Sequence, residues 1–302
     1  MRMVISAAPS TTVELSRLAV SDLSLAVETR NAGGRPCVLF AHGFGQTRGA
    51  WTATADTLAR GGCRCVSFDS RGHGQSDRLP GGDYHLEQFA DDLLRLARAQ
   101  PVPPVLVGAS MGGLLGLLLA GEVRPAPFAA LVLVDITPRW EPAGVERILA
   151  FMQACPDGFA DYTDAAARIA AYLPQRQGRK SEAQLRKLLR EGSDGRLRWH
   201  WDPALLAAVA HEGERYQGRL QAAARSVNVP ALLLSGSRSD VVSQATINEF
   251  MGLVPHAQHV QIEGATHMLA GDANDAFTAE VARFVSRMAT IPQRPPVAAV
   301  QP

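Results

Sequence analysis

Short apolar runs alternate with stretches of helical periodicity along most of the chain. Residues 13–20 and 23–29 alternate polar and apolar side chains around a Ser-Asp turn, which predicts an antiparallel hairpin. Six further runs are almost continuously apolar, as is typical of strands buried on both faces of a sheet. These runs cover residues 36–42, 64–70, 104–110, 130–136, 230–236 and 257–264.

The segments between these runs place apolar residues at the spacing of one helix face. They predict helices near residues 48–60, 85–99, 111–122, 242–253 and 273–288. Strands that alternate with helices indicate crossover connections, and therefore an α/β fold with a doubly wound, mostly parallel sheet.

The alternation of strands and helices stops after Pro138. Residues 139–225 contain four amphipathic stretches and no predicted strand, so we expect a helical cap inserted into the sheet domain. The expected core is formed by residues 1–138 and 226–289. Residues 290–302 are rich in proline and are expected to form a flexible tail.

The composition is typical of a globular protein without a polyanionic partner. Hydrophobic residues make up 46% of the chain, and 30 basic against 29 acidic residues leave a formal charge of +1. So small a charge creates no field that recruits nucleic acid or a membrane surface. No apolar run reaches the roughly 18 residues of a membrane span, and the first ten residues lack the apolar core of a signal peptide.

The cysteines predict a reducing, cytoplasmic setting. Cys37, Cys63 and Cys65 fall in segments expected to be buried, where a reduced cysteine behaves as a small apolar side chain. The spacing of Cys63 and Cys65 fits neither a zinc knuckle nor a redox pair, so no metal site is predicted.

The string Gly-Ala-Ser-Met-Gly-Gly at residues 108–113 lies between a predicted strand and a predicted helix. This is the context of a nucleophile elbow, in which a sharp turn exposes a serine at the sheet edge. Gly108 and Gly112 are expected where larger side chains would collide with neighbouring backbone. The helix amides favour developing negative charge, so Ser110 is the expected nucleophile.

A serine hydroxyl needs a base, and the base needs an orienting carboxylate. His267 follows the last predicted strand, where a loop reaches the same edge of the sheet. Asp240 is the favoured carboxylate because it fits the chain order Ser, Asp, His. Asp135 also ends a strand near the elbow, and it takes this role if Asp240 is only a helix N-cap.

Two backbone amides are expected to form an oxyanion hole, because the negative charge of an acyl-transfer intermediate develops there. One amide belongs to Met111 and the other to Phe44, in a loop that follows a buried strand. His42 is expected to hydrogen-bond and shape this loop and to stay outside the proton relay. The aromatic side chains of the insertion either line a pocket or pack the cap onto the core. The two tryptophans in Arg-Trp-His-Trp-Asp at 198–202 either line the pocket or anchor a loop between helices. The candidates for substrate contact are His42, Trp140, Trp199 and Trp201.

Taken together, these motifs resemble the α/β-hydrolase superfamily. The resemblance is carried by His-Gly-Phe-Gly from His42, by residues 68–77, by the elbow, by residues 236–242 and by Gly-Ala-Thr-His from Gly264. It implies an eight-stranded sheet with an antiparallel second strand, a cap after the sixth strand, and a Ser-His-Asp triad without a cofactor. Epoxide hydrolases and haloalkane dehalogenases look similar but place an aspartate at the elbow, so Ser110 argues against both.

The expected reaction is hydrolysis of a small, largely apolar carboxylic ester or lactone through an acyl-enzyme. Two alternatives stay open. One is a carbon–carbon bond hydrolase or a cofactor-free perhydrolase that uses the same triad. The other is a ligand receptor in which closure of the cap is the signal. The expected partner is a small molecule, and no oligomeric state is predicted.

Overall fold

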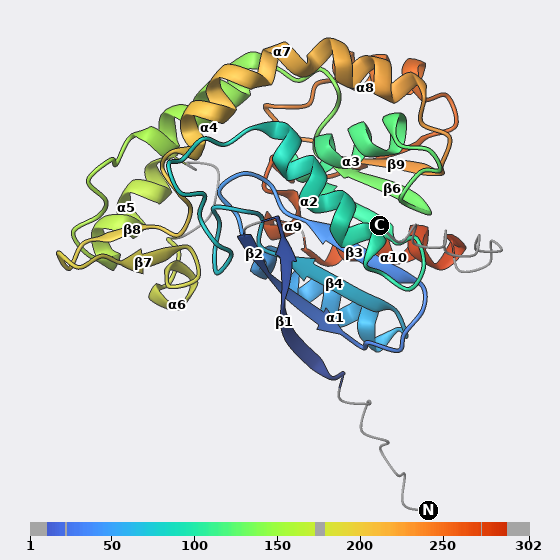
Figure 1. Ribbon diagram of the computed structural model, residues 1–302. Coiled ribbons are helices and arrows are strands. Elements are labelled where there is room, and N and C mark those ends of the chain that lie inside the picture. The colour runs from blue at the N-terminus through green and yellow to red at the C-terminus, as the bar shows by residue number, and fades with distance from the viewer. Residues whose placement is uncertain (1–10, 22, 173–178, 273, 289–302) are drawn as a thin grey trace, which may run out of the picture.

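The strands form one large sheet in the computed structural model, which describes residues 11–21, 23–172, 179–272 and 274–288. Eight strands follow the order β1-β2-β4-β3-β5-β6-β9-β10 (Figure 1). Strand β2 is antiparallel to both β1 and β4, and the other neighbours run parallel. The predicted α/β fold with a mostly parallel sheet is confirmed. The strands are β1 (Val13–Val20), β2 (Leu23–Arg30), β3 (Cys37–Ala41), β4 (Arg64–Phe68), β5 (Val105–Ala109), β6 (Ala130–Val134), β9 (Ala231–Gly236) and β10 (Gln258–Ile262).

Helices cover both faces of the sheet, because successive residues of its buried strands point to opposite sides. In β3, Val38 and Phe40 join the core beneath α1 and α10, whereas Leu39 joins the core beneath α2, α3 and α8. The helices are η1 (Arg48–Trp51), α1 (Thr52–Arg60), α2 (Leu86–Arg98), α3 (Met111–Glu122), α8 (Gln244–Leu253), α9 (Leu269–Asp272) and α10 (Asn274–Met288).

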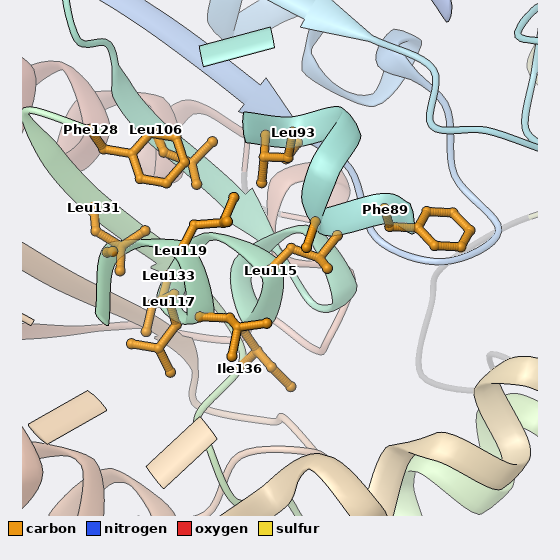
Figure 2. Close-up of a cluster of buried hydrophobic side chains, with 14 of the residues drawn as sticks. Phe89, Leu93, Leu106, Leu115, Leu117, Leu119, Phe128, Leu131, Leu133 and Ile136 are labelled. Carbon is orange, nitrogen blue, oxygen red and sulfur yellow. The ribbon is translucent and has the colours of Figure 1, made fainter. Parts of the chain in front are cut away.

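Helix α3 is apolar on nearly all sides because it lies between the sheet and other helices. Figure 2 shows its leucines among side chains of α2, β5 and β6. A Cβ added to Gly116 would lie 2.2 Å from Leu106 Cδ2, so glycine lets the helix approach the sheet closely. This packing fixes the N-terminus of α3, where Ser110 lies.

Residues 139–225, called here the inserted segment, lie between β6 and β9 and extend beyond one end of the sheet (Figure 1). The segment has a small core of its own that includes Phe159, Ile169, Leu185 and Leu197. Its long last helix returns to the sheet domain and packs against α3. The elements are α4 (Pro142–Gln153), α5 (Tyr162–Tyr172), α6 (Glu182–Leu185), β7 (Leu189–Glu191), β8 (Leu197–Trp199) and α7 (Leu205–Arg225).

The prediction of an insertion without strands is wrong for β7 and β8, which pair as an antiparallel hairpin. Gly195 provides the left-handed turn with a φ of +73°, and the side chains of Arg198 and Asp194 form an ion pair beside it. Leu189 and Leu197 point into the small core of the inserted segment. Residues 181–190 form one of the four amphipathic stretches, and only one turn of it is helical, as α6.

The expected positions of the cysteines agree with the structure, since Cys37, Cys63 and Cys65 are buried as free thiols. Burial raises the pKa of the Cys37 thiol to about 12. No helix among the described residues is long and apolar enough to cross a membrane. The predicted tail at 290–302 lies outside the described residues.

Candidate active site

Ser110 lies on a strained turn between β5 and α3. Its φ of 47° and ψ of −118° are unusual for a residue with a side chain, and it immediately precedes the first residue of α3. A Cβ on Gly108 would lie 2.6 Å from the Gly112 oxygen, and a Cβ on Gly112 would lie 2.4 Å from the Ala41 oxygen. Glycine is thus required on both sides of the serine, as the sequence predicts.

His267 lies against a buried carboxylate at the end of β6. Its Nδ1 is 2.8 Å from Asp135 Oδ2, and the Asp135 side chain is inaccessible to solvent. Because an ionised carboxylate only accepts hydrogen bonds, Nδ1 carries the proton and donates it. In the neutral ring, Nε2 of His267 then carries the lone pair that a general base requires.

Asp135 has further hydrogen-bond donors on both carboxylate oxygens. The Gly236 amide donates to Oδ1 at 2.8 Å, and the Ser239 hydroxyl donates to Oδ2 at 2.5 Å. A buried carboxylate requires such donors, since its lost hydration is otherwise uncompensated. They fix the carboxylate at the same sheet edge as His267.

The favoured assignment of Asp240 as the partner of His267 needs correction. Asp240 is partly exposed and forms an ion pair with Arg147 of α4, at 2.5 Å. The preceding residue, Ser239, turns inward to Asp135 and accepts the amides of Val241 and Val242. This turn directs Asp240 outward, so the structure brings the alternative carboxylate, Asp135, to His267.

The loop after β3 lies against the serine. A Cβ on Gly43 would be 3.1 Å from Ser110 Cβ. The amides of Gly43 and Gly45 donate to Gln46 Oε1 and His73 Nε2, both at 3.2 Å, whereas the Phe44 amide between them has no acceptor among the described residues. The Phe44 amide, next to Gly43, therefore keeps a donor that an oxyanion hole could use, and its role there stays a prediction.

The second expected donor is the amide of Met111. Met111 is the first residue of α3, and amides in the first turn of a helix have no acceptor within that helix. The expected oxyanion loop is also tied to the loop that carries His267, because Gln46 Nε2 donates to Met268 Sδ at 3.6 Å.

His42 is fully buried and holds this loop, as expected. Its Nδ1 is 2.8 Å from the Gly43 oxygen, and its Nε2 accepts the Ser70 amide at 2.9 Å. Burial lowers the pKa of the ring, so His42 is neutral. Both ring nitrogens are occupied by backbone groups, which contradicts its candidacy for substrate contact.

The three tryptophan candidates lie in different surroundings. Trp140 is buried in the core of the sheet domain. Trp201 is buried with its ring centroid 5.5 Å from that of Phe44, and Trp199 stacks on Trp201 at 6.4 Å. The structure therefore brings Trp201, and Trp199 behind it, to the oxyanion loop, and substrate contact stays a prediction for all three tryptophans.

Several residues of the site did not stand out in the sequence. Ser239 and Gln46 are common polar residues in loops, and only the fold shows that they contact Asp135 and Met268. The sequence did contain a signal for two histidines: His73 lies within the motif at 68–77, and His200 lies between two tryptophans.

Comparison with known proteins places this geometry in a family. Residues 36–273 match the model of the alpha/beta hydrolase fold family. The chain belongs to this family. It is 29% identical to the 3-hydroxybutyrate-oligomer hydrolase of Cupriavidus necator over 75% of this chain and 80% of that protein. It is also 29% identical to the sn-1-specific diacylglycerol lipase ABHD11 of Mus musculus, over 83% and 81% of the two chains.

A solved structure is similar over nearly the whole chain. The crystal structure of E-2-(acetamidomethylene)succinate hydrolase superposes with a TM-score of 0.79 and 25% identity, covering 91% of this chain and 100% of that one. All of these relatives are named as hydrolases, which supports a hydrolase role for this alpha/beta hydrolase fold protein.

Proposed function

We propose that this protein is a serine hydrolase that cleaves a small, largely apolar carboxylic ester or lactone through an acyl-enzyme. Ser110 is the nucleophile, His267 is the general base and Asp135 orients the imidazole. The observation that carries the proposal is the hydrogen bond between His267 and the buried Asp135, at the sheet edge where Ser110 lies on a strained turn.

The strand register supports the proximity of these groups. Ala109 of β5 pairs with Val134 of β6, so Ser110 and Asp135 follow neighbouring strands directly. No hydrogen bond joins Ser110 to His267 among the described residues. Such bonds are often long in unliganded hydrolases and shorten when substrate binds.

In the first half of the reaction, Ser110 Oγ attacks the carbonyl carbon while His267 Nε2 accepts the hydroxyl proton. The carbonyl π electrons move to the oxygen, and the amides of Phe44 and Met111 stabilise the resulting oxyanion. Asp135 stabilises the imidazolium through Nδ1–H. The carbon–oxygen bond to the leaving group then breaks, and His267 protonates the departing alkoxide.

In the second half, water attacks the acyl carbon and gives a proton to His267. The second tetrahedral intermediate collapses, Ser110 Oγ leaves, and His267 returns the proton to it. An ester thus gives a carboxylic acid and the alcohol released in the first half. A lactone gives one hydroxy acid, because its alcohol stays joined to the acyl chain, and in both cases the atoms of substrate and water are balanced.

The proposed substrate class follows from the residues above the oxyanion loop. Phe44 and Trp201 contact each other, and a Cβ on Gly45 would lie 2.3 Å from Met152 Cε, so apolar side chains of the inserted segment cover this loop. We therefore propose that residues 139–225 act as a cap over a core of 1–138 and 226–289. The names of the two curated relatives, an oligomer hydrolase and a lipase, agree with an ester substrate.

The experiment is hydrolysis of p-nitrophenyl esters with two to eight acyl carbons, together with labelling by a fluorophosphonate. Ser110→Ala is expected to lose turnover and labelling. Ser286→Ala, on the exposed face of α10, is the matched control and should keep both. Turnover by folded Ser110→Ala, or a wild-type protein inactive on every ester, would contradict the proposal.

A further inference from the structure

Three consecutive peptide units of the oxyanion loop are each held by a different imidazole. His42 donates to the Gly43 oxygen, His73 accepts the Gly45 amide, and His200 faces the Gly45 oxygen at 3.2 Å. His42 and His73 belong to the sheet domain, whereas His200 follows β8 in the inserted segment. The ring centroids of His42 and His73 lie 5.1 Å apart, and those of His73 and His200 lie 6.2 Å apart.

The hydrogen bonds of His200 define its tautomer. Its Nδ1 accepts the Gly74 amide at 3.0 Å, so this nitrogen is unprotonated. The proton of the neutral ring then lies on Nε2, which donates to the Gly45 oxygen. The ring is buried, and its backbone amide is bound to the Leu188 oxygen. His200 is thus fixed at both ends, between the two parts of the molecule.

The orientation of the Phe44 amide depends on these contacts. The amide shares a peptide plane with the Gly43 oxygen, and the next two peptide units are oriented by His73 and His200. Gly45 has a φ of +74°, a conformation that glycine adopts without strain and that does not hold the loop by itself. The loop has two hydrogen bonds of its own, from the Gln46 amide to the Gly43 oxygen and from the Gly43 amide to Gln46 Oε1. Neither involves the Phe44–Gly45 peptide group or the Gly45 oxygen, which His73 and His200 hold.

We infer that His200 is a positioning residue of the inserted segment that holds the oxyanion loop in its catalytic conformation through Gly45. The inference rests on the proposed function, because it gives the Phe44 amide a role in the reaction. It goes beyond that function because the oxyanion hole is then complete only when the inserted segment is packed on the sheet domain with His200 bound to the Gly45 oxygen. His200 does not contact the reacting atoms.

Two conservative substitutions separate the contacts of His200. In His200→Gln, the side-chain amide nitrogen lies near the position of Nε2 and keeps a donor for the Gly45 oxygen. In His200→Asn, the amide oxygen lies near the position of Nδ1 and keeps an acceptor for the Gly74 amide. His200→Ala loses both, and His259→Ala, on β10, is the control for loss of a histidine elsewhere.

The test measures kcat and KM for a p-nitrophenyl ester, with thermal melting and amide hydrogen exchange of residues 43–46. Loss of a whole oxyanion donor costs about 10²–10³ in kcat, so loss of its positioning in His200→Ala should cost about 10-fold, with little change in KM. His200→Gln should recover most of kcat and slow exchange. His200→Asn should stay slow in turnover even where its melting temperature is normal.

Three results would overturn the inference. The first is an unchanged kcat in folded His200→Ala, and the second is a change in KM alone. The third is equal recovery of kcat by His200→Gln and His200→Asn, because the bond to the Gly45 oxygen would then have no special role. An inactive wild-type protein would instead overturn the proposed function. The exchange rates then decide by themselves whether His200 orders the loop.

Discussion

Two aspartates, each beyond the end of a buried strand, have opposite surroundings. Asp135 directly follows β6, is inaccessible to solvent, and receives hydrogen bonds from His267, Gly236 and Ser239. Asp240 lies four residues beyond β9 and is partly exposed beside Arg147. The difference teaches that the donors around a carboxylate, and not its place in the chain order, decide whether it can orient a catalytic base.

The largest effect should come from removing His267, alone or together with Asp135. His267→Ala alone should lower kcat by about 10⁴ or more, and adding Asp135→Asn should cause little further loss, because residues that act as a unit are not additive. The measurement is a double-variant cycle of ester turnover. A further large loss on adding Asp135→Asn would show that the two residues act independently.

Much of the sheet could be predicted because its strands are buried on both faces. The run at 130–136 contains β6, and the run at 230–236 contains β9, each with its bounds within two residues. Glycines at 108 and 112 likewise indicated the sharp turn at Ser110. Continuous apolar runs and tight turns are local properties, so the sequence displays them directly.

The remaining features depend on contacts between distant segments. The hairpin of β7 and β8 carries several charged residues, and its burial against α5 is visible only in the folded protein. Asp135 and Asp240 both lie between Ser110 and His267 in the chain, so the order of residues does not discriminate between them. The contact of His200 with Gly45 spans 155 positions.

A smaller effect is expected from Ser239→Ala, which removes one donor from Asp135. Since the carboxylate is buried, the variant should unfold about 1–3 kcal/mol more easily. Turnover should fall by about 10-fold, because a carboxylate that has lost this donor also orients the His267 imidazole less well. Ser237→Ala is the comparison variant, because its hydroxyl donates to the exposed Glu263 and accepts the Gly264 amide but does not contact Asp135. If Ser239→Ala and Ser237→Ala had equal effects on chemical denaturation and on turnover, the bond of Ser239 to Asp135 would have no special role.

The buried histidines predict that the stability of the fold depends on pH. Burial lowers the pKa of His200 to about 4 and also lowers the pKa values of His42 and His73, so the unfolded chain binds more protons below about pH 6.5. The free energy of unfolding should therefore fall as the pH drops from about 6.5 towards 4, by up to about 1.4 kcal/mol per pH unit for each histidine.

Denaturation at a series of pH values tests this dependence. His200→Gln should reduce the slope, because it removes one titrating group, whereas the control Ser286→Ala removes no titrating group and should leave the slope unchanged. An identical slope in wild type and His200→Gln would show that His200 is not buried as a neutral ring.

The smallest effect should come from Arg147→Gln, which removes the partner of Asp240. Exposed ion pairs contribute about 0–1 kcal/mol, so both stability and turnover should stay close to wild type. A loss of turnover above about 10-fold, or 1.4 kcal/mol in the activation free energy, would give the exposed aspartate a role in catalysis.

The most direct measurement compares kcat of Asp135→Asn and Asp240→Asn on the same ester, with melting temperatures to establish that both fold. Asparagine preserves shape but does not favour the productive tautomer of His267, so Asp135→Asn should lower kcat by about 10⁴. Asp240→Asn should remain within about twofold of wild type, as expected for an exposed ion pair. The reverse result, with the large loss in Asp240→Asn, would contradict the assignment of Asp135 as the orienting acid.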